Sequence, residues 1–180
     1  MGATTTMVTV REFLQMAEPD GQRMELIGGE VVTMSYGGCP HEIAKSNLIE
    51  ILAVWLATNR IGKLCSETMF RLDDHNSPIP DVSIVSLARV KPGSKGHLQG
   101  APEVAIEVVS SETADALERK IDLYLAHGSK SVWVVFPRHR VVGLFDASGQ
   151  SRKFRLNQTL EDPTALPGFS APVSAIFEGI

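Results

Sequence analysis

Apolar positions along the chain follow either helical or strand spacing, and they predict an ordered series of elements. Helical spacing predicts a short helix within residues 8–17 and a longer one over 41–58, whose apolar stripe is Ala44, Leu48, Ile51, Leu52 and Trp55. Apolar runs bounded by turn residues predict a hairpin over 24–34 around Gly28-Gly29 and strands over 62–72, 81–86 and 103–109. The first two thirds of the chain therefore mix helices with strands.

The later part of the chain continues this pattern. Ser110 or Ser111 can cap a third helix, whose apolar stripe is Ala114, Leu117, Ile121, Tyr124 and Leu125. Strands over 131–136 and 140–145 predict another hairpin, and residues 147–180, rich in Pro, predict an extended or looped packing segment. We expect one domain over 1–180, an α/β sandwich with a mixed central β-sheet flanked by helices.

An apolar edge strand is expected at the second strand of that late hairpin. Val141, Val142, Leu144 and Phe145 give it an apolar character, and an exposed apolar edge needs covering. The sequence therefore favours a homodimer.

Composition narrows the class of protein. With 43% apolar and 21% charged residues, the chain has the make-up of a soluble globular protein. Cys39 and Cys65 have no CxxC spacing, so neither a zinc nor a redox site is indicated. The sequence has no apolar run of signal-peptide or membrane-span length, and we expect a cytoplasmic protein with no membrane partner.

Charge and common motifs exclude several functions. The net charge of −4 argues against a broad basic surface of the kind that dedicated nucleic-acid binders carry. No phosphate-binding GxxxxGK[ST] loop, dinucleotide-binding GxGxxG or nucleophile elbow GxSxG occurs in the sequence. The segment His41-Glu-Ile-Ala-Lys45 is half of a zinc-protease motif, because Lys45 stands where the second histidine would be.

Two carboxylates at predicted strands are the strongest chemical signal. Asp81 follows Pro80 at the start of an apolar strand, where ordinary turn chemistry is the alternative interpretation. Glu107 lies inside the apolar run Ala105–Val109, and a buried carboxylate needs a metal, a counter-charge or a proton. A structural salt bridge or a solvated strand face therefore stays open beside a catalytic role.

These residues belong to an ordered set of segments that resembles a known family. Pro80-Asp81 followed by Glu107 on the next strand is similar to the PD-(D/E)XK nuclease signature. The larger set resembles the Uma family of restriction endonucleases over about residues 8–146, and comprises Glu25–Glu30, His41, Ile79–Val85, Gly100–Ser110 and Lys120–Tyr124. The resemblance implies a restriction-endonuclease-like fold, DNA as substrate and a homodimer.

The resemblance also implies a metal site. Asp81, Glu107 and the Val108 carbonyl would hold magnesium or manganese, for which oxygen ligands are suited. The wider superfamily has a lysine two residues after the second carboxylate, where this chain has Val109. Lys120 is the candidate replacement, since it lies at the edge of the apolar stripe of its helix. The alternative is a lysine that only covers apolar surface.

Two further residues enter the predicted site through the resemblance. His41 begins its helix on the apolar line and could simply pack there, whereas the resemblance places it in the site. Glu25 could face the cleft or solvent, and the resemblance makes it a third acidic group near the metal. We expect phosphate contacts from the loop that carries Arg89, Lys91, Lys95 and His97, although such a loop can equally be only solvated.

The sequence thus predicts a metal-dependent endonuclease with Glu25, His41, Asp81, Glu107 and Lys120 as its catalytic residues. Two alternatives remain. The fold could serve as a catalytically silent binding or assembly module, which the missing in-strand lysine favours, or the metal site could hydrolyse another phosphodiester.

Overall fold

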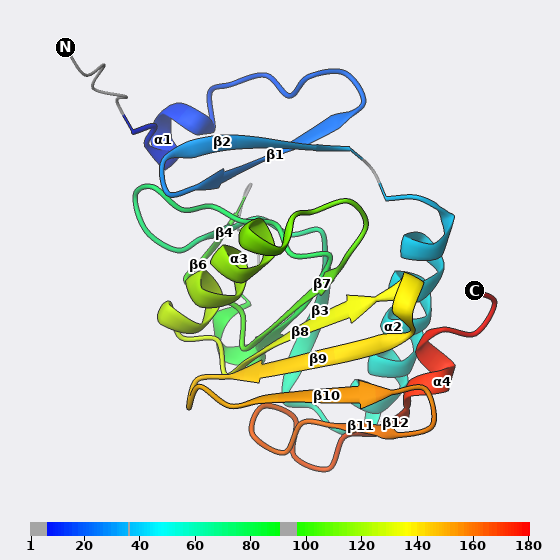
Figure 1. The fold of residues 1–180 in the computed structure, drawn as a ribbon. Helices are drawn as coiled ribbons and strands as arrows, with labels where there is room; N and C mark the ends of the chain where they lie inside the picture. The colour runs from blue at the N-terminus through cyan, green and yellow to red at the C-terminus, as the bar shows by residue number, and fades with distance from the viewer. Residues whose placement is uncertain (1–6, 36, 91–96) are drawn as a thin grey trace.

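A six-stranded mixed sheet forms the centre of the protein, as a computed structural model describes it for residues 7–35, 37–90 and 97–180 (Figure 1). The strand order is β10-β9-β8-β7-β5-β3, and only β7 and β8 run parallel. The strands are β3 (Gly62–Ser66), β5 (Val82–Ser86), β7 (Val104–Val108), β8 (Ser131–Phe136), β9 (Val141–Asp146) and β10 (Ser151–Arg155). The expected α/β sandwich with a mixed sheet is confirmed.

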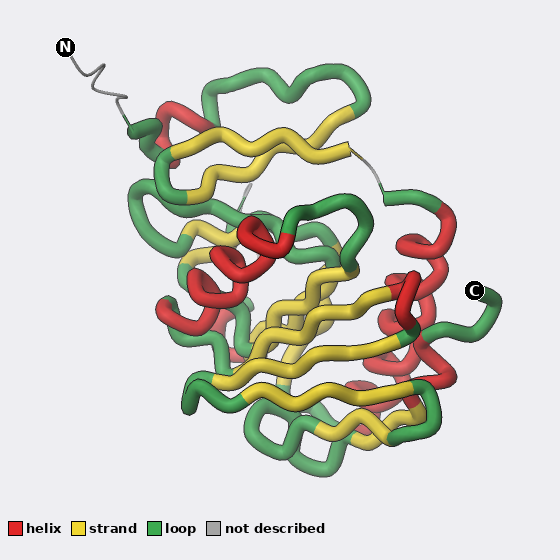
Figure 2. Tube along the Cα trace, viewed as in Figure 1, coloured by secondary structure: helices red, strands yellow, loops and turns green. Residues whose placement is uncertain are grey.

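Helices lie on both faces of this sheet (Figure 2). One face packs against α2 (Cys39–Thr58) and the C-terminal α4 (Val173–Ile176), and the other against α3 (Ala114–Ala126), which connects β7 to β8. A short α1 (Val10–Phe13) precedes the hairpin of β1 (Gln22–Ile27) and β2 (Glu30–Ser35). None of the helices in the described part of the chain is both long and apolar enough to cross a membrane.

The remaining elements are short. Two-stranded pairs are formed by β4 (Phe70–Arg71) with β6 (Leu98–Gln99) and by β11 (Thr159–Glu161) with β12 (Ser170–Pro172). Single 3₁₀ turns follow β5 at η1 (Leu87–Arg89) and β8 at η2 (Pro137–His139).

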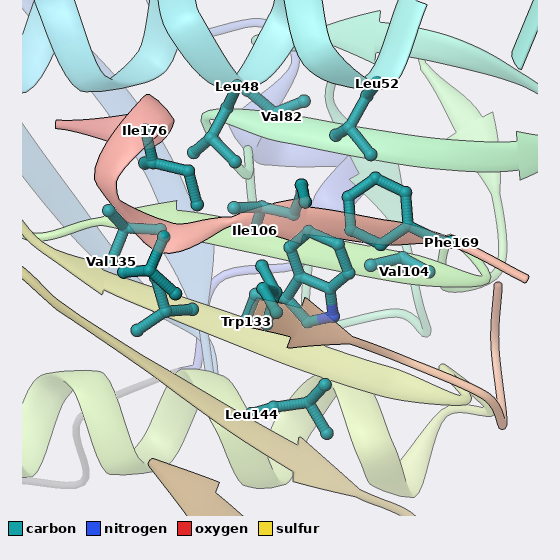
Figure 3. Packing of buried hydrophobic residues seen from close by; sticks show 14 of the residues in the cluster. Leu48, Leu52, Val82, Val104, Ile106, Trp133, Val135, Leu144, Phe169 and Ile176 are labelled. Carbon is teal, nitrogen blue, oxygen red and sulfur yellow. The ribbon is translucent and has the colours of Figure 1, made fainter. Parts of the chain in front are cut away.

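The main core lies between α2 and the sheet (Figure 3). Leu48 and Leu52 of α2 pack onto the strand residues whose side chains face α2, such as Ile106 and Trp133. Phe169 from the C-terminal segment lies beside them. The side chains of β7 and β8 that point to the other face of the sheet, including Ala105 and Val134, pack against Tyr124 and Ile121 of α3. Because successive strand residues alternate between faces, Glu107 shares the α3 face with Ala105.

Three local predictions need correction. The first helix covers only Val10–Phe13, since its Thr9 capping box is followed by a turn after one helical turn. The predicted strand 62–72 is interrupted and becomes β3 and β4. The cap of α3 is Thr113, whose side chain accepts from the Ala116 N–H, because the helix begins later than Ser110 or Ser111 would require.

The C-terminal segment departs furthest from the prediction. It supplies β10, which pairs with β9 in antiparallel register and so covers the strand that was expected to be an exposed edge. The sheet edges are therefore β10 and β3. The prediction of an exposed apolar edge at β9 is therefore wrong, and it gives no support for a homodimer.

Candidate active site

Five separate parts of the chain bring the predicted site residues together at one end of the sheet. Glu25 lies on β1, His41 in the first turn of α2, Asp81 directly before β5, and Glu107 on β7. Lys120 reaches this group from the middle of α3. The sequence prediction of these five positions as neighbours agrees with the contacts that follow.

Lys120 is the central cation of the cluster. Its Nζ lies 2.8 Å from Glu107 Oε1 and 3.0 Å from Glu25 Oε1, and the exposed fractions of Lys120, Glu107 and Glu25 are 6%, 5% and 1%. The alternative in which Lys120 only covers apolar surface is therefore wrong. An ammonium placed between two buried acidic side chains offsets part of the cost of removing charged groups from water.

Glu107 also accepts a hydrogen bond from a residue that the sequence assigned only to the apolar stripe. Tyr124 Oη donates to Glu107 Oε1 over 2.9 Å. Tyr124 lies one helical turn after Lys120, so both side chains reach the same carboxylate from the same face of α3. The four-residue spacing of Lys120 and Tyr124 was the one feature of the sequence that could have indicated that both side chains reach the same carboxylate.

Asp81 is held by two contacts from different elements. Its Oδ2 accepts the Val108 N–H at 2.7 Å, and its Oδ1 lies 3.2 Å from His41 Nε2. The first contact attaches Asp81 to the residue directly after Glu107. Asp81 and Glu107 therefore lie close together, and His41 contacts Asp81 from the start of α2.

Glu25 is fixed by the backbone as well as by Lys120. The Ile79 N–H donates to Glu25 Oε1 at 2.5 Å, and β1 is further tied to the segment before β5 by the Leu26–Ser77 bridge. Glu25 and Lys120 line a cleft of about 300 Å³ between the hairpin and the start of α3, together with Met34, Ser110 and Glu112 among others. The cluster is therefore buried but adjoins a cleft.

The surroundings shift the acid–base properties of these groups. Burial raises the pKa of Glu107 to about 8; Lys120 opposes this shift, whereas the Asp81 and Glu25 carboxylates add to it. The pKa of Lys120 is raised, because the attraction of Glu107 and Glu25 outweighs the effect of burial. Although burial acts in the opposite direction, the His41 contact and the Val108 N–H lower the pKa of Asp81. The pKa of His41 is raised, since Asp81 and Glu42 outweigh burial.

A second ionic network supports the His41 side of the site. Lys45, one turn after His41, lies 2.7 Å from Glu42 Oε2 and 2.6 Å from Glu67 Oε1, while Arg23 of β1 lies 2.8 Å from the same Glu67 oxygen. Glu42 Oε1 also lies 3.1 Å from His41 Nδ1. The network joins the hairpin to α2, and no sequence pattern predicted it because its members are far apart along the chain.

The expected phosphate-binding loop is described only in part. Lys91 and Lys95 lie outside the described residues. The Arg89 guanidinium donates to the carbonyls of Ala101, Gln99 and Gly100, so it ties the loop before β7 to η1. Arg89 therefore has a structural role.

The donor chemistry at the cluster fits a hard divalent cation. Among the described residues, no group of three or more His, Cys, Asp or Glu side chains forms a preformed metal cage. Magnesium does not require such a cage, because one or two carboxylates, water and substrate phosphate commonly complete its shell. Asp81 and Glu107 provide two carboxylates, and no described residue hydrogen-bonds Glu107 Oε2.

The sandwich, with acidic groups on two adjacent strands and a lysine beside them, defines a restriction-endonuclease-like α/β protein. Residues 10–174 match the Uma2 family, described as "Putative restriction endonuclease", so the chain belongs to this family. A search of curated proteins found no match. Among solved structures, the chain is similar to a "putative nuclease belonging to DUF820" from Anabaena variabilis, with a TM-score of 0.82 and 20% identity over 94% of this chain and 97% of the other.

Proposed function

We propose that the protein is a magnesium- or manganese-dependent endonuclease that hydrolyses DNA phosphodiester bonds. Membership of a family described as restriction endonucleases supports the reaction class. The observation that carries the proposal is the Lys120 ammonium, 2.8 Å from Glu107 and beside a cleft, in place of a lysine at the Val109 position. A lysine in this place supplies the positive charge that a phosphodiester transition state needs.

The residues have distinct roles in this proposal. Asp81 and Glu107, with the Val108 carbonyl, would hold the metal, which when bound polarises a phosphate oxygen and makes bound water more acidic. Lys120 stabilises negative charge on the attacked phosphate. His41 holds Asp81 in position through its 3.2 Å contact, and Glu25 holds Lys120 through its 3.0 Å contact.

The test is nicking of supercoiled plasmid in manganese by wild type, Glu107→Gln and Lys120→Met. We expect the wild type to cleave and both site variants to fail, with circular dichroism verifying that each variant folds. Lys130→Met is the matched control and should cleave like the wild type, since Lys130 is exposed and lies outside the cleft that Glu25 and Lys120 line. A folded wild type that binds manganese without cutting DNA would favour the silent binding module, or a hydrolase of another phosphodiester if one is cleaved.

Two other expectations belong to the same proposal. A homodimer follows from the family resemblance, and sedimentation of the purified protein tests it. A cytoplasmic location is part of the same proposal, and fractionation of cells that express the protein tests it.

A further inference from the structure

The α3 face of the sheet is covered unevenly. Helix α3 contacts β8, whereas β9 and β10 carry no helix on that face among the described residues, as the ribbon in Figure 1 also shows. Two adjoining hollows of about 560 and 350 Å³ follow this uncovered part. They share Phe136, His139 and Phe145, so they form one groove, which we call the β9–β10 groove.

The β9–β10 groove begins at the candidate active site. Its first hollow is lined by Val109, Ser110 and Glu112, and the last two of these also line the cleft that holds Glu25 and Lys120. Register across the sheet gives the same relationship. Glu107 pairs with Val134, Val134 with Gly143 and Gly143 with Lys153. Lys153 is therefore three strand spacings, about 14 Å, from Glu107 on the same face.

Two phenylalanine rings line the floor of the groove, and a glycine lies between them. Phe136 and Phe145 are both partly exposed, and a Cβ added to Gly143 would lie 3.1 Å from the Phe145 ring and 3.9 Å from the Phe136 ring. Gly143 thus leaves the space between the two rings free of a side chain. Partly exposed rings along a groove are the surfaces on which unpaired bases stack.

The charge of this region is opposite to that of the whole chain. Residues 137–155 carry five basic side chains and one acidic one, Asp146, although the net charge of the protein is −4. Arg138, Lys153 and Arg155 are exposed and form no ion pair with a described residue. Glu112 and Glu118 line the α3 side of the groove, and Glu112 is engaged by the Ser110 and Ser111 N–H groups.

We propose that the β9–β10 groove holds a single-stranded segment of the nucleic-acid substrate beside the active site. Phe136 and Phe145 contact bases, while Arg138 and Lys153 contact phosphates. The inference rests on the proposed nuclease function for its substrate. A second copy of the chain is a less suitable occupant, since Arg152, Lys153 and Arg155 on edge strand β10 would repel the same residues of another copy.

The test measures binding without cleavage. Fluorescence anisotropy of a labelled oligothymidylate of about 20 nucleotides is recorded in EDTA across a salt series. We expect Lys153→Glu to weaken binding at least about five-fold and to reduce the salt dependence. Lys63→Glu, the same charge change on the other edge strand, should have a smaller effect on both. Equal effects of the two variants would overturn the inference, because they would indicate a general charge effect.

A second pair of variants tests the aromatic contacts. Phe145→Leu should weaken binding to the oligothymidylate more than Phe154→Leu, whose ring packs on the opposite face of the sheet. Duplex DNA should be affected less than the single strand. Stronger binding to polyglutamate than to the oligonucleotide, or a change of oligomeric state with Lys153→Glu in light scattering, would overturn the inference in favour of an acidic protein or a second copy.

The two proposals fail in different ways. Loss of binding in Lys153→Glu together with a wild type that cuts no DNA would contradict the nuclease function and leave the groove as a nucleic-acid site. Plasmid nicking by a protein whose single-strand affinity is unchanged in Lys153→Glu would contradict the groove and leave the nuclease.

Discussion

Lys120 Nζ lies 2.8 Å from Glu107 Oε1, so a helix supplies the cation that the strand lacks at Val109. The Val109 side chain instead packs with the apolar cluster beneath α3. The exchange keeps a lysine next to the second carboxylate while adding an apolar contact at the end of β7. It also couples the site to the packing of α3, because Lys120 is flanked by Ile121 and followed one turn later by Tyr124, both buried.

Lys120→Met should destabilise the protein by about 3–5 kcal/mol, since it leaves the buried Glu25 carboxylate without its cation, and above about pH 8 the Glu107 carboxylate as well. Urea unfolding measures this change. Adding Glu25→Gln should restore part of the lost free energy of unfolding by removing one uncompensated charge. An additive loss in the double variant would contradict the ion-pair account. Arg119→Met should leave stability nearly unchanged, because the Arg119 side chain on the same helix is 62% exposed.

Tyr124→Phe should lower the free energy of unfolding by about 1–3 kcal/mol, because a buried carboxylate loses its hydroxyl donor without a change in side-chain packing. The same change should make Glu107 harder to ionise. Manganese titrations of wild type and variant at several pH values check this, and we expect the variant to reach half-maximal affinity at a higher pH. Identical pH profiles would mean that the 2.9 Å contact does not act on the carboxylate.

The pKa of Glu107, raised by burial from 4.5 to about 8, predicts a pH-dependent metal site. A carboxylate must lose its proton to bind the ion, so metal affinity should rise between about pH 6 and 9, with proton release on binding. Calorimetry in buffers of different ionisation enthalpy measures that release. Glu107→Gln should abolish it, whereas a pH-independent affinity in the wild type would contradict the raised pKa.

The same shift has a consequence for stability in EDTA. A raised pKa means that the folded protein holds the Glu107 proton more tightly than the unfolded chain does. Its stabilising contribution is therefore complete below about pH 4.5 and is lost as pH rises through about 8. Urea unfolding from pH 5 to 9 should show a flatter profile in Glu107→Gln than in the wild type.

The elements of the fold that could be predicted from the sequence are those that leave a local pattern of apolar and polar residues. Helix α2 and the strands β5, β7 and β8 could be predicted from the spacing of their apolar residues. Burial on one or both faces of each element requires that spacing. Strand β10 escaped prediction because four of its five residues are exposed and it has a single apolar side chain, Phe154. Its strand conformation comes from pairing with β9, a tertiary effect.

The candidate site shows the same division. Glu107 was noticeable as a charge inside an apolar strand, and Lys120 by its place beside a helical stripe. The hydrogen bond from Tyr124 could not be separated from ordinary packing, since a tyrosine on an apolar stripe satisfies the pattern whether or not its hydroxyl has a partner. The link from Lys45 through Glu67 to Arg23 depends on the placement of three separate elements, which no local pattern records.

Gly37 sets the position of His41, and this gives a matched pair of substitutions. A Cβ at Gly37 would lie 2.2 Å from His41 Nδ1, whereas a Cβ at Gly38 would meet nothing closer than Pro40 Cδ at 4.0 Å. Gly37→Ala should therefore turn the His41 ring away and break its 3.2 Å contact with Asp81.

The measurement is the His41 pKa by NMR in EDTA. Asp81 and Glu42 raise this pKa against the effect of burial, so their loss should bring it down in Gly37→Ala but not in Gly38→Ala. Plasmid nicking should fall in the same variant if His41 positions Asp81 for the metal. An unchanged His41 pKa would mean that the ring accommodates the methyl group without leaving Asp81. A lowered pKa with full nicking would instead limit His41 to a structural role.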